Sequence, residues 1–200
     1  MSAGLLYLAS ASPRRRDLLD QIGVTCLVRP VDIDEARQPE EAARDYVLRL
    51  ARDKAEAAWS RFAASEGSPV LAADTAVVLD GEIFGKPRDQ TEGTAMLDRL
   101  SGRTHEVLTA VALRTRAGLD ARLSASRVTF RALVRGEPER YWQTGEPADK
   151  AGAYAVQGHA AMFITHLSGS YSGVMGLPLF ETAELLQRAG FELWTQTPPR

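Results

Sequence analysis

The feature that most constrains this chain is a ten-residue apolar run, Val70–Leu79, which is interrupted only by Asp74 and Thr75. A run of this length and composition predicts a strand that is buried on both faces, in the middle of a covered sheet. The Asp-Gly pair behind it is a hairpin turn signal that leads into a short strand at Glu82–Phe84. The chain is therefore predicted to fold around a central strand that carries one carboxylate among apolar neighbours.

The remaining pattern alternates strands and helices in the first half of the chain and is hairpin-like in the middle. This order predicts an α/β fold with a twisted mixed sheet flanked by helices. The length of 200 residues favours a single domain, 1–200, with two lobes around a cleft and a loose tail from about residue 191. The predicted strands are Leu5–Ala9, Thr25–Arg29, Thr104–Arg116, Ala121–Arg131 and Ala161–His166, and the predicted helices are Pro13–Ile22, Pro39–Phe62, Thr91–Leu100, Glu137–Gln143 and Pro178–Arg188, with Glu146–Gly158 as a loop.

Charge and cysteine content exclude several classes of protein. The formal net charge is -2, which gives no general attraction to nucleic acid or to anionic membranes. Cys26 is the single cysteine, so no intrachain disulfide can form, and this fits the reducing cytoplasm. The apolar stretch at the N-terminus precedes its charges, and no apolar run is long enough to cross a bilayer. We expect a cytoplasmic protein without a nucleic-acid or membrane partner.

The basic residues are distributed unevenly between arginine and lysine. Of 24 basic residues, 21 are arginine and three are lysine, and the chain has no asparagine. Codon bias explains this balance in general, because exposed lysines can be replaced by arginine at little cost. A lysine that persists under such a bias indicates a position where a compact ammonium is required. The three lysines are Lys54, Lys86 and Lys150.

A cluster of polar residues stands where the first predicted strand passes into the first helix. Its sequence is Ser-Ala-Ser-Pro-Arg-Arg-Arg, from Ser10 to Arg16. Helix N–H groups, the hydroxyls of Ser10 and Ser12, and the three guanidiniums of Arg14–Arg16 meet there, which suits a phosphate chain. A plain helix cap with solvated arginines explains the string equally well.

Three further residues are candidates for chemistry. A carboxylate such as Asp74 inside an apolar run needs a cation, a metal or hydrogen bonds, although a turn-capping role is the alternative. Lys54 follows Leu50 and Val47 on the apolar face of its helix, so it either snorkels at a core edge or lines a cleft opposite Asp74. Glu35 lies in an acidic stretch that is ordinarily a solvated loop, but it could supply a magnesium ligand.

Other catalytic signatures are missing from the sequence. It contains no G-x-x-x-x-G-K-[ST] phosphate loop and no G-x-S-x-G nucleophile elbow. The spacing of His105, His159 and His166 matches no helical zinc motif, so we interpret these as structural or surface residues.

Seven ordered blocks carry a family resemblance. They read LASASPRRRDLL, VDIDE, RLARDKA, AADTAVVLDGEIFGKP, MLDRLSG, TGEPADKAGAYAVQG and GSYSGVMGLPL. Over nearly its whole length the chain resembles the Maf family of nucleotide pyrophosphatases, and within it the dTTP/UTP pyrophosphatase branch. The resemblance implies an ITPase-like fold with a deep cleft, a divalent metal such as Mg²⁺ or Mn²⁺, and homodimers. It also implies a house-cleaning enzyme that hydrolyses dTTP and UTP to the monophosphate and pyrophosphate.

The resemblance also assigns roles to residues. Asp74 matches the proposed proton acceptor, and Glu35 and Asp74 are the expected metal ligands. Arg14, Thr75 and Gln157 match the positions that distinguish the pyrimidine branch from a 7-methyl-GTP branch, which typically has tryptophan, glutamine and glutamate there. The catalytic candidates are Asp74, Lys54, Lys86 and Glu35, and the substrate-binding candidates are Ser10, Ser12, Arg14, Arg15, Thr75 and Gln157. The chain departs from the family pattern at Ala72, where glycine is usual, and at Ser172 and Gly173, where tyrosine and asparagine are usual.

Three alternatives stay open at this point. The chain could perform the same reaction on 7-methyl-GTP or another modified nucleotide. It could be a nucleotide-binding regulator, for example of septum formation, with slow or no turnover, although binding alone needs no base such as Asp74. Nucleic-acid binding through Arg14–Arg16 is disfavoured by the acidic overall balance.

Overall fold

The computed structural model describes residues 5–193, and its sheet has the strand order β2-β1-β3-β5-β6-β7, with β4 paired to β3. β1 is parallel to β2 and β3, whereas the other pairs are antiparallel. The predicted mixed sheet is therefore confirmed. The strands are β1 (Leu6–Leu8), β2 (Cys26–Val28), β3 (Val70–Leu79), β4 (Glu82–Phe84), β5 (Thr104–Thr115), β6 (Gly118–Phe130) and β7 (Ile164–Ser168).

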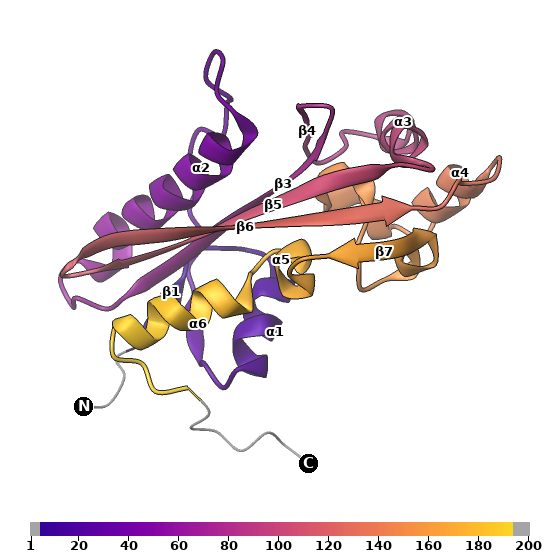
Figure 1. The fold of residues 1–200 in the computed structure, drawn as a ribbon. Helices are drawn as coiled ribbons and strands as arrows, with labels where there is room; N and C mark the ends of the chain where they lie inside the picture. Colours follow the sequence, from indigo (N-terminus) through magenta and orange to yellow (C-terminus); the bar gives the residue numbers. More distant parts are fainter. Residues whose placement is uncertain (1–4, 194–200) are drawn as a thin grey trace.

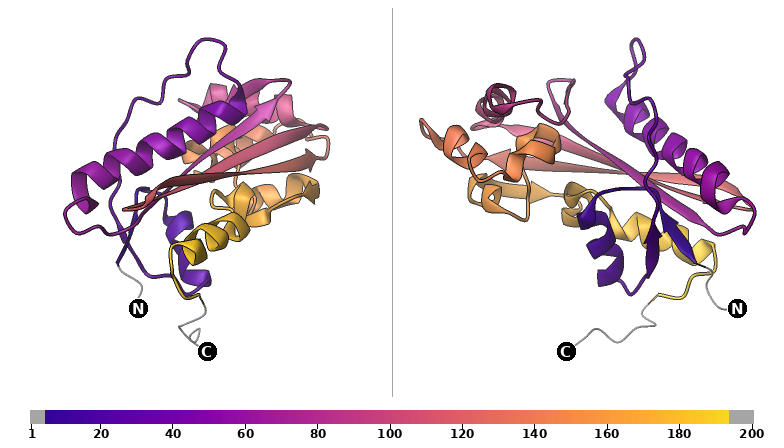
Figure 2. Two further views of the ribbon diagram at one scale, coloured as in Figure 1. Left: turned by 60° about the vertical axis from the view of Figure 1, so that its left-hand side comes forward. Right: turned by 180° about the vertical axis from the view of Figure 1, so that it is seen from behind.

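Helices cover both faces of this sheet and gather at its two ends. The long strands β3, β5 and β6 run through both ends (Figure 1). One end, the α2 lobe, carries α2 on one face and α1 and α6 on the other, as the view from behind also shows (Figure 2). The other end, the α3 lobe, carries β4, β7, α3 and α4 (Figure 1). The helices are α1 (Pro13–Gln21), α2 (Ala43–Ala58), α3 (Gln90–Leu100), α4 (Glu137–Trp142), α5 (Tyr171–Met175) and α6 (Leu179–Arg188).

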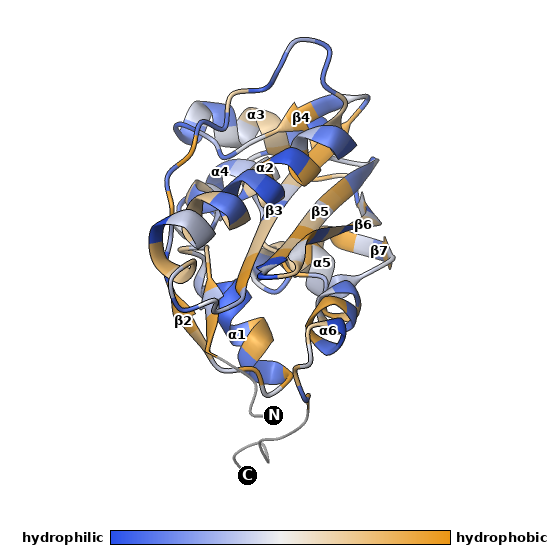
Figure 3. Ribbon diagram, turned by 90° about the vertical axis from the view of Figure 1, so that its left-hand side faces the viewer, coloured by the Kyte–Doolittle hydropathy of each residue, from blue (hydrophilic) through white to orange (hydrophobic). Residues whose placement is uncertain are grey.

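The two-residue alternation of β3 assigns its side chains to opposite faces. Val70 and Ala72 belong to the core under α2, whereas Leu71 and Ala73 belong to the core under α1 and α6. Orange, apolar colour dominates β3 and β5 in Figure 3, while the covering helices show both colours, as amphipathic helices do. By the same alternation, the polar pair in the middle of β3 places its aspartate towards α2 and its threonine towards α1.

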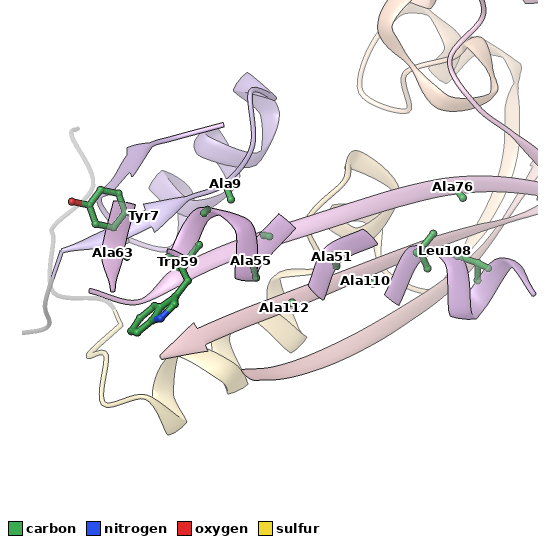
Figure 4. Close-up of a cluster of buried hydrophobic side chains, with 14 of the residues drawn as sticks. Tyr7, Ala9, Ala51, Ala55, Trp59, Ala63, Ala76, Leu108, Ala110 and Ala112 are labelled. Atoms are coloured by element: carbon green, nitrogen blue, oxygen red, sulfur yellow. The ribbon is translucent and has the colours of Figure 1, made fainter. Parts of the chain in front are cut away.

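Small side chains bring α2 close to the sheet. Figure 4 shows Ala51 and Ala55 of α2 in one buried cluster with Ala110 and Ala112 of β5. Alanines on both sides allow the helix axis to approach the strands closely. A side chain of ordinary length on α2 can therefore reach the residues of β3.

Several predicted boundaries were wrong. The helix predicted over 39–62 begins at Ala43, and its last turn is a π-helical segment, η1 (Trp59–Ala63). The strand predicted over 161–166 begins only at Ile164, after a 3₁₀ turn, η4 (His159–Phe163). Ala160 and Phe163 are both buried, and this spacing of three fits a 3₁₀ helix rather than a strand. The expected loop over 146–158 contains two further 3₁₀ turns, η2 (Glu146–Asp149) and η3 (Ala151–Ala153), and α5 was not predicted.

The C-terminal segment is anchored further along the chain than residue 190. Phe191 is buried in the core under α6 with Leu185 and Leu186, and the expected tail beyond residue 193 lies outside the described residues. Within residues 5–193, no helix combines the length and apolar character that a bilayer crossing requires.

Candidate active site

A cavity of about 510 Å³ lies between the two lobes. Its walls come from the β1–α1 junction, the 30–35 loop, α2, the middle of β3, the segment after β4 and the turns around η2 and η3. The structure brings the predicted catalytic and substrate-binding residues to this one cleft, whereas the guanidinium of Arg16, which was expected at the same junction, is exposed and does not line it. The predicted residues in the cleft are Ser10, Ser12, Arg14, Arg15, Glu35, Lys54, Asp74, Thr75, Lys86 and Gln157.

Lys54 joins the two candidate carboxylates. Its Nζ lies 2.7 Å from Oδ1 of Asp74 and 2.7 Å from Oε1 of Glu35. The side chains of Lys54 and Asp74 are each 12% exposed, whereas that of Glu35 is 57% exposed. The ammonium thus reaches the carboxylates across the cleft, and a buried pair of opposite charge avoids the cost of an unpaired one. This is the cleft-lining position that the sequence left open.

The two carboxylates fit a divalent cation. Lys54 contacts one oxygen of each, and within residues 5–193 no protein partner is recorded for the second oxygen of Asp74 or of Glu35. Two negative charges around one ammonium leave a surplus charge of about -1, and Mg²⁺ and Mn²⁺ prefer such oxygen ligands. The same range holds no group of three acidic, histidine or cysteine side chains that could bind a metal. The donor set therefore suits a cation that the phosphates of a substrate also bind.

Arg15 is held by three uncharged acceptors. Its Nε donates to the carbonyl of Gly176 at 2.7 Å, one terminal nitrogen donates to Ser10 Oγ at 3.0 Å, and the other to Thr75 Oγ1 at 3.3 Å. The pKa of Arg15 is lowered from its usual value, because burial lowers it by more than the charge of Asp74 raises it. A guanidinium has five N–H donors and keeps its charge in proteins, so two donors remain for an anion.

The β1–α1 junction supplies neutral donors beside this guanidinium. Ser10 Oγ accepts from the Ser12 N–H at 3.2 Å and from Arg15 at 3.0 Å, so both of its lone pairs are used. Its proton is then available for a ligand. Ser12 is the N-cap of α1 and Pro13 follows it, but no side chain caps the helix there. The first N–H groups of α1 are therefore open to an anion.

Asp149 connects the two lobes and was missed in the sequence. Its Oδ2 lies 3.8 Å from Nη1 of Arg14 on α1, and it also forms an ion pair with Lys150. Burial raises the pKa of Asp149, but the hydrogen bond from Lys150 and the charges of Lys150 and Arg14 more than offset this and lower it. Lys150 lines the cavity as well, so all three lysines of the chain face the same cleft.

Two further residues, Tyr46 and Thr109, contribute to the site although the sequence did not predict them as site residues. Tyr46 of α2 donates from its hydroxyl to the carbonyl of Glu35 at 3.1 Å and thus fixes the acidic loop over the cleft. Thr109 of β5 lies 3.0 Å from Thr75, and it stands inside an apolar run just as Asp74 does. The polar interruption of an apolar strand could therefore have identified Thr109, whereas nothing in the sequence marks Tyr46.

Comparison with known proteins gives consistent matches. The family described as "Maf-like protein" matches residues 5–189. The chain is 56% identical over 194 residues to the dTTP/UTP pyrophosphatase of Bordetella avium, which covers 94% of this chain and 96% of that protein. It is 55% identical over 185 residues to the dTTP/UTP pyrophosphatase of Methylobacillus flagellatus, with 92% of each chain covered. Among solved structures, the Staphylococcus aureus Ham1 protein matches with a TM-score of 0.49 and 13% identity, over 92% of this chain and 96% of that one.

Proposed function

The chain belongs to the Maf family, and from this premise we propose that its cleft hydrolyses the α–β phosphoanhydride of dTTP and UTP. The products are the nucleoside monophosphate and pyrophosphate. The observation that carries the proposal is the placement of the Asp74–Lys54–Glu35 cluster in one cleft with the Arg15 guanidinium. Relatives that are named dTTP/UTP pyrophosphatases support the choice of substrate.

Asp74 is the proposed base. Lys54 holds the carboxylate through Oδ1, which leaves Oδ2 to orient a water molecule and to take its proton. The water oxygen bonds to one phosphorus of the α–β bridge, and the bond from that phosphorus to the bridging oxygen breaks. Lys54 holds the carboxylate of Asp74 in place through the ion pair at 2.7 Å.

The other wall of the cleft is suited to the phosphates. The two remaining N–H donors of Arg15, the proton of Ser10 and the first N–H groups of α1 can bind phosphate oxygens. Arg14 and the exposed Lys86 add positive charge at the same cleft. Preorganised donors of this kind stabilise the charge that develops on the departing phosphate group. Gln157, on the rim, offers both a donor and an acceptor to a base.

We propose that Asp74 and Glu35, together with the phosphates, hold one Mg²⁺ or Mn²⁺. When bound, such a cation supplies Lewis-acid polarisation of a phosphoryl oxygen. Removal of the divalent cation by EDTA should therefore abolish turnover, and an excess of Mg²⁺ or Mn²⁺ should restore it.

The decisive experiment is a panel of nucleoside triphosphates with Mg²⁺ or Mn²⁺, in which pyrophosphate release is measured. We expect UTP and dTTP to react well ahead of GTP, ATP and 7-methyl-GTP. Fast reaction of 7-methyl-GTP alone would instead favour that substrate. Tight binding of UTP without pyrophosphate release would contradict the proposal and favour a regulator.

The same resemblance supports a homodimer that works in the cytoplasm as a house-cleaning enzyme. The net charge of -2 favours no nucleic-acid partner. Sedimentation equilibrium checks the dimer, because one chain has a mass of 21.8 kDa and the expected particle has twice that mass.

A further inference from the structure

Thr109 is a completely buried hydroxyl behind the Arg15 guanidinium. It lies on β5, directly opposite Thr75 of β3 in the register of the two strands. Its Oγ1 donates to the carbonyl of Gly173 at 2.7 Å and lies 3.0 Å from Thr75 Oγ1. Proteins rarely bury a hydroxyl without a hydrogen-bond partner. Here both partners belong to segments that line the cleft, β3 and α5.

The donor and the acceptor in each hydrogen bond around Thr109 can be assigned. A hydroxyl has a single proton, and Thr109 gives it to the Gly173 carbonyl, which cannot donate. In the contact between the two threonines, Thr75 is therefore the donor. The proton of Thr75 is thus turned away from the cleft, and its lone pairs remain for the N–H of Arg15. Without Thr109, Thr75 would be free to rotate its proton towards the guanidinium.

The second bond of Thr109 supports another acceptor of Arg15. Gly173 lies in α5, and Gly176 ends this helix in the left-handed conformation, with φ at 117°. The carbonyl of Gly176 accepts from Arg15 Nε at 2.7 Å. Thr109 is therefore connected to two acceptors of Arg15. It bonds to the backbone of α5, which ends at the acceptor Gly176, and it bonds directly to Thr75, which is itself an acceptor of Arg15.

We propose that Thr109 is a positioning residue that holds Arg15 so that its two remaining N–H donors face the phosphates. The inference rests on the proposed function only in taking those phosphates to belong to a nucleoside triphosphate. A guanidinium with fixed acceptors on three donors loses little conformational entropy when it binds an anion. Thr109 therefore acts on affinity for phosphate groups without touching them.

The test uses inorganic pyrophosphate, which carries phosphates but no base, and isothermal titration calorimetry in Mg²⁺ buffer. Thr109→Val keeps the shape of the side chain and removes the hydroxyl. We expect the Kd for pyrophosphate to rise about tenfold, which is the scale of one hydrogen bond to a charged group. The KM for UTP should rise in parallel while kcat changes less, because Asp74 and Lys54 stay in place.

Two controls separate positioning from stability. Thr109→Ser retains the proton and should bind pyrophosphate nearly as well as the wild type. Thr104→Val breaks a different threonine pair of the same sheet, between Thr104 and Thr129 at 2.8 Å, and should leave affinity unchanged. If Thr109→Val does not fold, Thr75→Val removes the same acceptor of Arg15 and should raise the Kd for pyrophosphate.

The outcomes are distinct. Wild-type pyrophosphate affinity in folded Thr109→Val, or in Thr75→Val where Thr109→Val does not fold, would overturn the inference, and so would a wild-type protein that does not bind pyrophosphate. A wild type that binds pyrophosphate, with the expected loss in Thr109→Val, supports the inference even if no nucleotide is hydrolysed. In that last case only the proposed function fails.

Discussion

The ammonium nitrogen of Lys54 lies 2.7 Å from Oδ1 of Asp74, although the two residues come from α2 and β3. Each side chain is 12% exposed, so neither charge is well solvated. Removal of Lys54 would leave the carboxylate of Asp74 buried without its ion-pair partner, which costs more than the pair itself contributes. Substitutions at these positions should therefore conserve shape, so that effects on the reaction are separated from effects on folding.

Asp74→Asn meets this requirement. The amide oxygen can still accept from Lys54, and a neutral group is easier to bury, so the variant should fold. If Asp74 is the base, kcat for UTP should fall by roughly 10²-fold or more. Pyrophosphate release and the thermal midpoint are measured together, with Asp80→Asn, in the exposed turn that follows β3, as the control. A folded Asp74→Asn variant with most of its activity would exclude Asp74 as the base.

Lys→Arg substitutions test the meaning of the retained lysines. Lys54 fits between two carboxylates at 2.7 Å each, and a planar guanidinium is wider than the ammonium it replaces. Lys54→Arg and Lys86→Arg should each lower kcat/KM for UTP, whereas the reverse change Arg16→Lys at an exposed site should not. Near wild-type turnover in both lysine variants would leave codon bias as the explanation.

Substrate choice should depend on Arg14, Thr75 and Gln157, which all line the cleft. An amide such as Gln157 both donates and accepts, which matches the carbonyl and N–H edge of uracil, whereas a glutamate only accepts. The triple variant Arg14→Trp, Thr75→Gln, Gln157→Glu should shift preference towards 7-methyl-GTP, because tryptophan and glutamate favour a cationic base. The measurement is the ratio of kcat/KM for UTP over 7-methyl-GTP. A wild-type ratio near one, or an unmoved ratio in the variant, would show that these positions do not discriminate between bases.

His105 should make the fold sensitive to acid. It is buried beside Tyr154, with 2.8 Å between Nε2 and the hydroxyl, and burial lowers its pKa from 6.5 to about 4. Since the unfolded chain binds this proton more readily, the contribution to stability is complete above pH 6.5 and is lost as the pH falls towards 4. The loss should amount to about 3 kcal/mol in the free energy of unfolding.

Denaturant titrations at several pH values check this expectation. His105→Gln removes the titrating ring and should flatten the decline between pH 6.5 and 4. His166→Gln, at an exposed position, should leave the decline as it is in the wild type. An equal decline in all three proteins would assign the acid sensitivity to other groups.

The sequence could predict the sheet and most of the site because both depend on local patterns. The apolar run around Asp74 predicts a buried central strand, and the helical spacing of Lys54 predicts a side chain on the covered face. Local patterns cannot show how segments far apart in the chain meet. The contact of Asp149 with Arg14, and the bond from Tyr46 to the backbone of Glu35, depend on the tertiary fold.

The errors in the fold have a similar origin. The strand predicted over 161–166 includes residues 161–163, which belong to a 3₁₀ turn whose buried side chains, Ala160 and Phe163, lie three positions apart. Helix α5 is too short to show a periodicity, and its capping bond, from the Gly173 N–H to Ser170 Oγ, uses a serine that is unremarkable in the sequence. Short elements are set by packing and capping more than by propensity.

The gathering of Lys54, Lys86 and Lys150 in one cleft has a practical consequence for anyone who handles this protein. Every side-chain amine of the chain faces the site, so reagents that acylate amines, including common dyes and coupling resins, have no side-chain target elsewhere. Conjugation through a lysine would therefore attach the protein by its cleft, with Lys86 as the most exposed of the three. Attachment through a terminal tag leaves the cleft accessible.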